Sequence, residues 1–86
     1  MQGKTKSGFK YDVSKEVLDD MRLIEAIRGS DKDPMKVMDI VDMVLGDNKE
    51  KLYEHVKTEG GRVPVSAVQA EMTEIFKAFG EEGKNS

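Results

Sequence analysis

The segment from Asp33 to Gly46, with the sequence DPMKVMDIVDMVLG, most constrains the fold because it combines the most apolar run with signals for both helix ends. Asp33 suits the N-cap position, where a carboxylate accepts a hydrogen bond from a free backbone N–H. Pro34 fits the first helical position, and Gly46 can take the left-handed conformation that ends a helix. Apolar residues cover most of the circumference: Met35, Val37, Met38, Ile40, Val41, Val44 and Leu45. The pattern predicts a core helix surrounded by the other elements.

Residues 2–13 are expected to form a small β-hairpin. Ser7-Gly8 is a short turn signal, and Phe9, Tyr11 and Val13 alternate with polar residues at the period of a half-buried strand. An isolated two-stranded hairpin is marginal in water, so its apolar face should lie over helices.

A helix is predicted on each side of this core segment. The first spans residues 14–28, with Ser14 as its N-cap, Gly29 as its stop and an apolar stripe formed by Val17, Leu18, Met21, Ile24 and Ile27. The next begins at Asp47 and ends at Gly60-Gly61, and its large apolar residues are Leu52, Tyr53 and Val56. Charged residues fill the rest of that helix, so it should lie on the surface.

The last predicted helix begins at or just after Pro64 and ends at Gly80. Its apolar face consists of Val65, Val68, Met72, Ile75, Phe76 and Phe79. The expected fold is therefore mainly α: one helical domain over residues 1–80, in which the hairpin precedes an orthogonal or irregular four-helix bundle. Residues 81–86 form a polar segment that is expected to be disordered.

Composition excludes several classes of function. The net charge of −3 provides no basic face for nucleic acid. The absence of cysteine excludes disulfides and thiolate metal sites. No apolar run approaches the roughly 20 residues of a membrane span, and the N-terminal lysines precede no apolar segment, so neither a membrane partner nor a signal peptide is expected.

No residue set indicates catalysis, a cofactor or a metal. His55 is the only histidine and is predicted to have a structural or surface role. Asp31-Lys32-Asp33 lacks the later glycine and glutamate of a calcium loop, and Gly60-Gly61-Arg62 lacks the strand and lysine of a phosphate loop. Four serines have no base nearby in the sequence and are assigned no nucleophilic role: Ser7, Ser14, Ser30 and Ser66.

The methionines and the last aromatic residues are candidates for binding a partner. Methionine is unbranched and polarisable, so it suits irregular apolar partners, although it also fills gaps in small cores. Met43 lies in the polar arc of its helix, and Phe76 and Phe79 either pack on the core helix or present themselves at a protruding helix end. The candidate partner-binding residues are Met43, Met72, Phe76 and Phe79.

Six short segments along nearly the whole chain resemble those of one family: Lys6-Ser7-Gly8-Phe9-Lys10, Val17-Leu18-Asp19-Asp20, Leu45-Gly46-Asp47, His55-Val56-Lys57, Gly61-Arg62-Val63 and Glu71-Met72-Thr73-Glu74-Ile75. In this pattern the chain resembles the small tail assembly chaperones of long-tailed, siphovirus-type bacteriophages and prophages of Gram-positive bacteria.

The resemblance implies a non-catalytic protein of the bacterial host cytoplasm. It implies binding to the phage tape measure protein, recruitment of tail tube protein and absence from the mature virion. Many members of the family also have a longer, frameshifted form, which would be a further partner. Several copies on one client would make the chain a homo-oligomer.

Three other classes of function compete with this interpretation. The first is a structural minor tail or head-completion component that stays in the virion. A nucleic-acid binder would need a basic recognition helix, whereas the regular part of the last helix has Lys77 as its one basic residue. An enzyme would need a convergent set of acid, base, nucleophile or metal ligands, which the sequence does not indicate.

Overall fold

The N-terminal hairpin begins the chain, as its alternating pattern predicts. The computed structural model describes residues 1–84, with side chains described as far as Glu81. Strand β1 (Gln2–Lys4) pairs antiparallel with β2 (Lys10–Asp12), and Gly3 lies opposite Tyr11. The turn is closed by the Gly8 N–H, which donates to the Thr5 carbonyl at 3.0 Å, and Gly8 has a φ of 99°. The predicted face of Phe9, Tyr11 and Val13 is buried.

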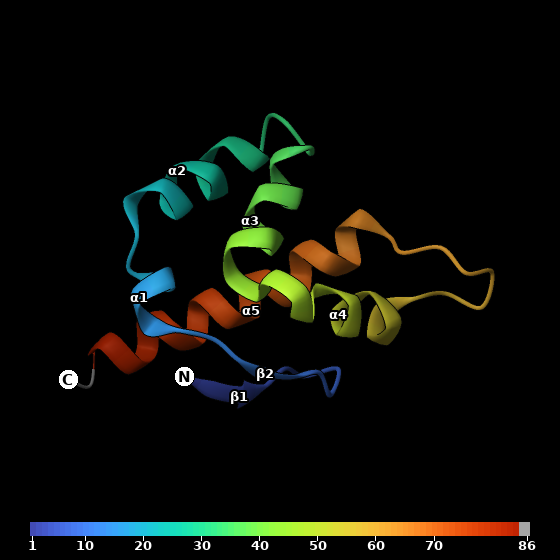
Figure 1. Cartoon of the computed structure of the whole chain (residues 1–86), viewed down its shortest axis with the longest axis horizontal. Coiled ribbons are helices and arrows are strands. Elements are labelled where there is room, and N and C mark those ends of the chain that lie inside the picture. Colours follow the sequence, from blue (N-terminus) through green and yellow to red (C-terminus); the bar gives the residue numbers. More distant parts are fainter. Residues whose placement is uncertain (85–86) are drawn as a thin grey trace.

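The first predicted helix is wrong as one continuous element, because it breaks at Asp19-Asp20. Helix α1 (Lys15–Leu18) begins at Ser14, whose hydroxyl accepts from the Glu16 N–H, as predicted. Helix α2 (Met21–Ser30) then begins in a new direction (Figure 1). Asp20 is extended there and its carboxylate accepts from the Arg22 N–H at 2.9 Å. A second cap within the predicted helix therefore starts a second helix.

The break changes which side of α2 faces the core. Leu23 and Ala26 are buried, whereas Met21 and Ile24 of the predicted stripe are 66% and 49% exposed. The helix also continues through Gly29 to Ser30. The predicted stop at Gly29 is therefore too early, and the N–H groups of Lys32 and Asp33 both donate to the Gly29 carbonyl just after the helix.

Replacing Asp20 with alanine should lower the free energy of unfolding by about 1 kcal/mol, because the Arg22 N–H would lose its acceptor. Urea denaturation followed by circular dichroism measures this change. Asp19→Ala is the matched control, since Asp19 is exposed and follows α1 rather than capping α2. Equal losses for the two variants would contradict the capping role of Asp20.

Helix α3 (Lys36–Leu45) is the predicted core helix. Its predicted start at Pro34 is two residues early, because Met35 occupies the N-cap position and the Asp33 carboxylate closes the preceding turn by accepting from the Met35 N–H at 3.0 Å. Gly46 ends the helix with a φ of 54°. The buried residues are Val37, Ile40, Val41, Val44 and Leu45. The prediction that α3 is surrounded is wrong for its remaining side, where three methionines are exposed: Met35, Met38 and Met43.

A 3₁₀ turn, η1 (Gly46–Asn48), leads into α4 (Lys49–Val56). The predicted bounds of this helix are thus wrong at both ends, since no side chain caps it at Asp47 and it ends before Gly60-Gly61. The glycines instead form a tight loop, in which Gly61 has a φ of 87° and its N–H donates to the Thr58 carbonyl. Figure 1 shows this connection projecting from the body of the molecule.

Helix α5 (Val65–Lys84) follows Pro64, as predicted, and crosses behind α3 (Figure 1). The predicted helix end at Gly80 is wrong, because the helix continues to Lys84. An interior glycine costs a helix only about 1 kcal/mol, which neighbouring helix formers can offset. The predicted disorder of residues 81–86 is therefore wrong for residues 81–84, which are helical, and residues 85 and 86 lie outside the described residues.

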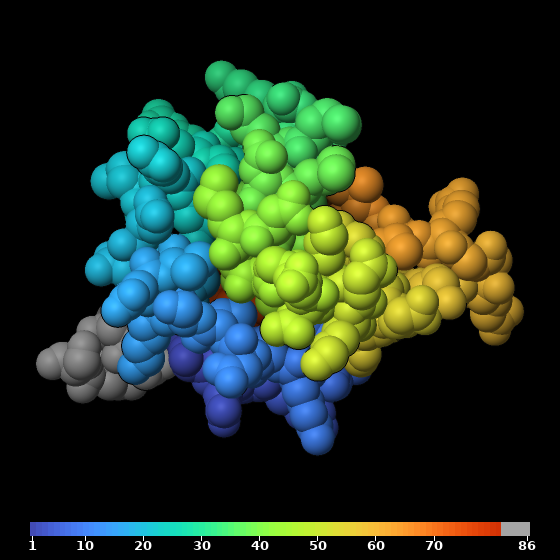
Figure 2. All heavy atoms as spheres, in the orientation of Figure 1, coloured from blue at the N-terminus to red at the C-terminus, as the bar shows by residue number. Residues whose placement is uncertain are grey.

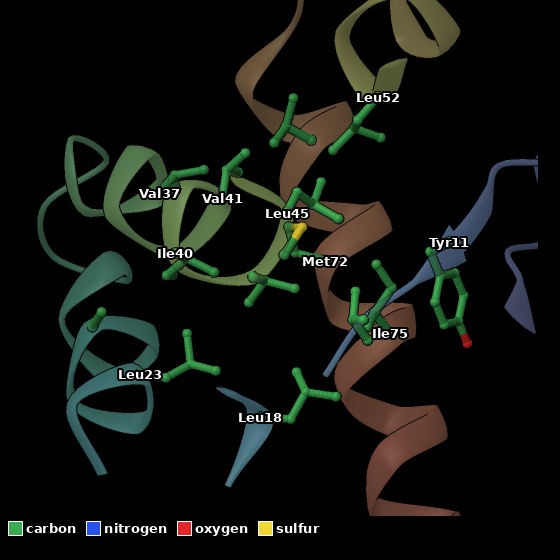
Figure 3. Close-up of a cluster of buried hydrophobic side chains, with 14 of the residues drawn as sticks. Tyr11, Leu18, Leu23, Val37, Ile40, Val41, Leu45, Leu52, Met72 and Ile75 are labelled. Atoms are coloured by element: carbon green, nitrogen blue, oxygen red, sulfur yellow. The ribbon is translucent and has the colours of Figure 1, made fainter. Parts of the chain in front are cut away.

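The core lies where α3 meets α2, α4, α5 and the hairpin. Figure 3 shows side chains from each of these elements converging: Tyr11, Leu18, Leu23, Val37, Ile40, Val41, Leu45, Leu52, Met72 and Ile75. The structure confirms a mainly helical fold with an N-terminal hairpin, and the helices cross at steep angles as an irregular bundle (Figure 1).

Candidate partner-binding groove

An apolar groove of about 340 Å³ opens between the first half of α3, the middle of α4 and the beginning of α5. In Figure 2 the green surface of α3, the yellow surface of α4 and the orange surface of the last loop and α5 meet on the right of the view. Its lining is apolar apart from one phenol: Pro34, Met35, Val37, Met38, Val41, Tyr53, Val63, Val65 and Val68. We call this the α3–α5 groove.

The floor and the rim of the α3–α5 groove differ in exposure. Val37, Val41 and Val68 are buried and belong to the core. Met35 and Met38 are 69% and 54% exposed and form the rim contributed by α3. A rigid floor of branched residues under a flexible methionine rim suits an apolar partner of irregular shape.

The opposite rim comes from the loop before α5. Val63 and Val65 are exposed there, on either side of Pro64. The loop is braced from within, because the Thr58 N–H donates to the Arg62 carbonyl and the Arg62 N–H donates to the Thr58 hydroxyl at 3.2 Å. These hydrogen bonds close the loop just before Val63, and the exposed side chains of Val63 and Val65 extend the apolar surface of the groove.

The structure separates the four residues that the sequence proposed for partner binding. Met43 is exposed on α3 but does not line the α3–α5 groove. Met72 is only 3% exposed and belongs to the core, so a partner could reach it only if the core opened. Phe76 and Phe79 are half-buried against the core cluster. Their part in partner binding stays a prediction.

Sequence reasoning missed the α3–α5 groove because Met35 and Met38 were assigned to the face of a fully surrounded helix. Val65 was assigned to the apolar face of the last helix, and Val63 was assigned to no element. No local signal distinguishes an apolar residue at a groove rim from one in the core. The one available hint was the excess of methionines in so short a core helix.

The second constellation joins the hairpin turn to α4 and α5. Ser7 Oγ donates a hydrogen bond to Glu71 Oε1, and His55 Nε2 lies 3.0 Å from Ser7 Oγ. The Thr5 hydroxyl is 3.1 Å from the same oxygen. Ser7 and His55 are 48 positions apart, so the sequence alone did not indicate that they meet.

The direction of these hydrogen bonds determines what the cluster can do. A hydroxyl has one proton, and that of Ser7 goes to Glu71, so His55 must donate through Nε2–H to the Ser7 oxygen. A nucleophilic serine would require the reverse, with histidine accepting the serine proton. The cluster therefore anchors the turn, together with the Lys6 N–H, which donates to Glu74 Oε2 at 3.1 Å.

Two surface ion pairs stabilise α4. Lys49 Nζ lies 2.8 Å from Asp42 Oδ1 and connects α4 to α3, and the hydrogen bond to Asp42 raises the pKa of Lys49. Lys57, which follows the last residue of α4, pairs with Glu54 at 3.0 Å. Both pairs are solvent-exposed, so each contributes little to stability.

The described residues contain neither a metal-binding cluster nor a helix that could cross a membrane. Among the described residues, no three or more histidine, aspartate or glutamate side chains are grouped so as to hold a metal ion. No helix in the described part of the chain is long and apolar enough to cross a membrane. Comparisons with protein-family models, curated proteins and solved structures find no match to this chain.

Proposed function

We propose that this chain is a tail assembly chaperone of a long-tailed bacteriophage or prophage, which binds the tape measure protein in the host cytoplasm. The structural observation that supports this proposal is the α3–α5 groove. It is an apolar surface with a methionine rim, on a domain whose residues are 36% charged. The resemblance of six segments along the chain supports the same function. The role is non-catalytic.

In the proposed mechanism, an apolar helical face of the unassembled tape measure protein lies in the groove. Such faces aggregate in water unless they are covered, and a hydrophobic groove covers them by the helix-in-groove mode. Burying one large apolar side chain contributes about 1.5–3 kcal/mol. A few buried side chains of the client therefore stabilise the complex, while tail assembly can still release the client. The charged remainder of the surface keeps the complex in solution.

Replacing Met38 with glutamate should abolish the ability of this chain to keep its client soluble. The substitution puts a carboxylate on the rim of the groove, and covering that charge with an apolar helix carries a large desolvation cost. The measurement co-expresses the chain with the large protein encoded downstream of it and determines the soluble fraction and the co-purified complex. We expect at least a tenfold loss of complex.

The matched control is Met21→Glu, because Met21 is an equally exposed methionine on α2, outside the groove. Met21→Glu should solubilise the client as well as the unchanged chain does. Equal binding by the folded Met38→Glu chain would exclude the groove as the client site. A client that is insoluble with every variant, or soluble without any of them, would contradict the chaperone function itself.

The alternative function is a minor tail or head-completion component, for which the same apolar groove would be a permanent interface. Mass spectrometry of purified virions separates the two functions. A chaperone should be absent from the particle, whereas a structural component should be present in a fixed number of copies. Tail tube protein and a longer form of the chain are the further partners to seek in the co-purified complex.

A further inference from the structure

A second depression, of about 520 Å³, lies between the hairpin and the start of α4. Figure 2 shows the blue hairpin against the yellow-green start of α4, and Figure 1 shows the same neighbours. Its lining includes three lysines from three elements: Lys4 of β1, Lys10 of β2 and Lys51 of α4. We call it the lysine pocket. Unlike the α3–α5 groove, it combines cationic and aromatic groups.

The three lysines give the lining of the pocket a net positive charge, because it contains one carboxylate. The ion pairs among the described side chains join Lys49 to Asp42 and Lys57 to Glu54, and none includes a lysine of the pocket. The one carboxylate in the lining, Asp12, accepts a hydrogen bond from the neutral amide of Gln2 at 3.3 Å, keeps its negative charge and offsets one of the three lysines. A chain with a net charge of −3 therefore concentrates cations in one concave place.

Two of these lysines also oppose each other directly. The strand register pairs Lys4 with Lys10 across the hairpin. Like charges directly opposite in an antiparallel pair are destabilising. An anion bound between the two ammonium groups would remove this repulsion.

The other walls of the lysine pocket are fixed by packing. A Cβ at residue 3 would lie 2.4 Å from Tyr11 Oη and 2.6 Å from Cζ, so the tyrosine ring lies against the bare backbone of Gly3. Asn48 adds an amide from the turn before α4. The volume of the pocket falls within the range of small-molecule sites, and lysine ammonium groups bind oxyanions as point charges.

We propose that the lysine pocket binds a multivalent oxyanion, held by Lys4, Lys10 and Lys51. The shared chemistry is a compact group with two or more negative charges on oxygen, borne by either phosphate or carboxylate groups. This inference is independent of the proposed chaperone function, because it uses neither the α3–α5 groove nor a protein client.

The test titrates the purified chain with inorganic pyrophosphate and, separately, with citrate, at constant ionic strength set by sodium chloride. Thermal denaturation and amide chemical shifts are the two readouts. Binding to the folded state raises Tm in a saturable way. Saturation by pyrophosphate alone would assign the site to phosphate, and saturation by both probes would assign it to oxyanions in general. A shift that only grows linearly, as general salt exclusion produces, would overturn the proposal.

Lys10→Gln and Lys51→Gln should each weaken binding about tenfold, since each removes a charge-assisted hydrogen bond. Lys32→Gln, in the loop between α2 and α3, is the control and should bind as the unchanged chain does. Lys10→Glu gives the clearest test, because two opposite effects are expected. In the absence of anion it should raise Tm, since the new carboxylate would pair with Lys4. It should also abolish anion binding. Unchanged titrations for the Lys10 and Lys51 variants would exclude the pocket.

Discussion

Replacing Ile75 with alanine should lower the free energy of unfolding by about 2–5 kcal/mol, the cost of emptying a buried aliphatic site. Ile75 is 0% exposed in the middle of α5, and Figure 3 shows its side chain between Leu18 and Tyr11. Domains of this size have little stability to lose, so Tm should fall by at least about 10 °C. Urea and thermal denaturation, followed by circular dichroism, measure the change.

Ile24→Ala is the matched control, because it makes the same chemical change at a helical site that is 49% exposed. Its effect should stay within about 0.5 kcal/mol, since alanine also has the higher helix propensity. The original prediction of one continuous helix places Ile24 on the buried stripe. A loss as large as that of Ile75→Ala would therefore contradict the break at Asp19-Asp20.

Replacing Ser7 with alanine should cost about 1–3 kcal/mol, because it removes the hydrogen-bond donor of a buried carboxylate. Glu71 is 6% exposed, and its Oε2 already has no hydrogen-bond partner among the described groups. Without the Ser7 hydroxyl, Oε1 would lose its donor too. The loss should appear first at the hairpin. Relative to the unchanged chain, amide hydrogen exchange should accelerate more in β1 and β2 than in α3.

The double variant Ser7→Ala/Glu71→Met should be more stable than Ser7→Ala alone. Replacing both partners with apolar groups removes the buried carboxylate. Replacing Ser7 alone leaves the Glu71 carboxylate buried without its hydrogen-bond donor. A double-mutant cycle measures the coupling between the two residues. Ser66→Ala, at an exposed serine on α5, should leave stability within about 0.5 kcal/mol. Additive effects of the Ser7 and Glu71 changes would contradict a direct coupling.

The two candidate sites differ in how far the sequence could have predicted them. The excess of methionines indicates a partner surface, but the residues named for it, Met43, Met72, Phe76 and Phe79, do not line the α3–α5 groove. Helical spacing assigns a residue to a face of its own helix and says nothing of which neighbour covers that face. The lysine pocket likewise needs the register of Lys4 and Lys10 and the approach of α4.

Several features of the fold depend only on local hydrogen bonds and side-chain period, and the sequence predicts them correctly. These are the hairpin with its buried Phe9, Tyr11 and Val13, and the hydrogen bonds that the side chains of Ser14 and Asp33 accept from backbone N–H groups two residues on. The stop at Gly46 and the start of α5 after Pro64 belong with them. Each requires only groups within a few residues of one another, so the chain encodes it locally.

Tertiary structure alone decided which of two competing apolar faces is buried. The Asp20 cap that begins α2 is itself a local signal, but the burial of Leu23 and the exposure of Met21 depend on the elements packed against α2. The exposure of the methionine side of α3 likewise depends on its neighbours. Tertiary structure also brought Ser7, His55 and Glu71 together from three elements. The physical reason is that burial and long-range hydrogen bonds depend on the neighbours across the core, which local spacing does not specify.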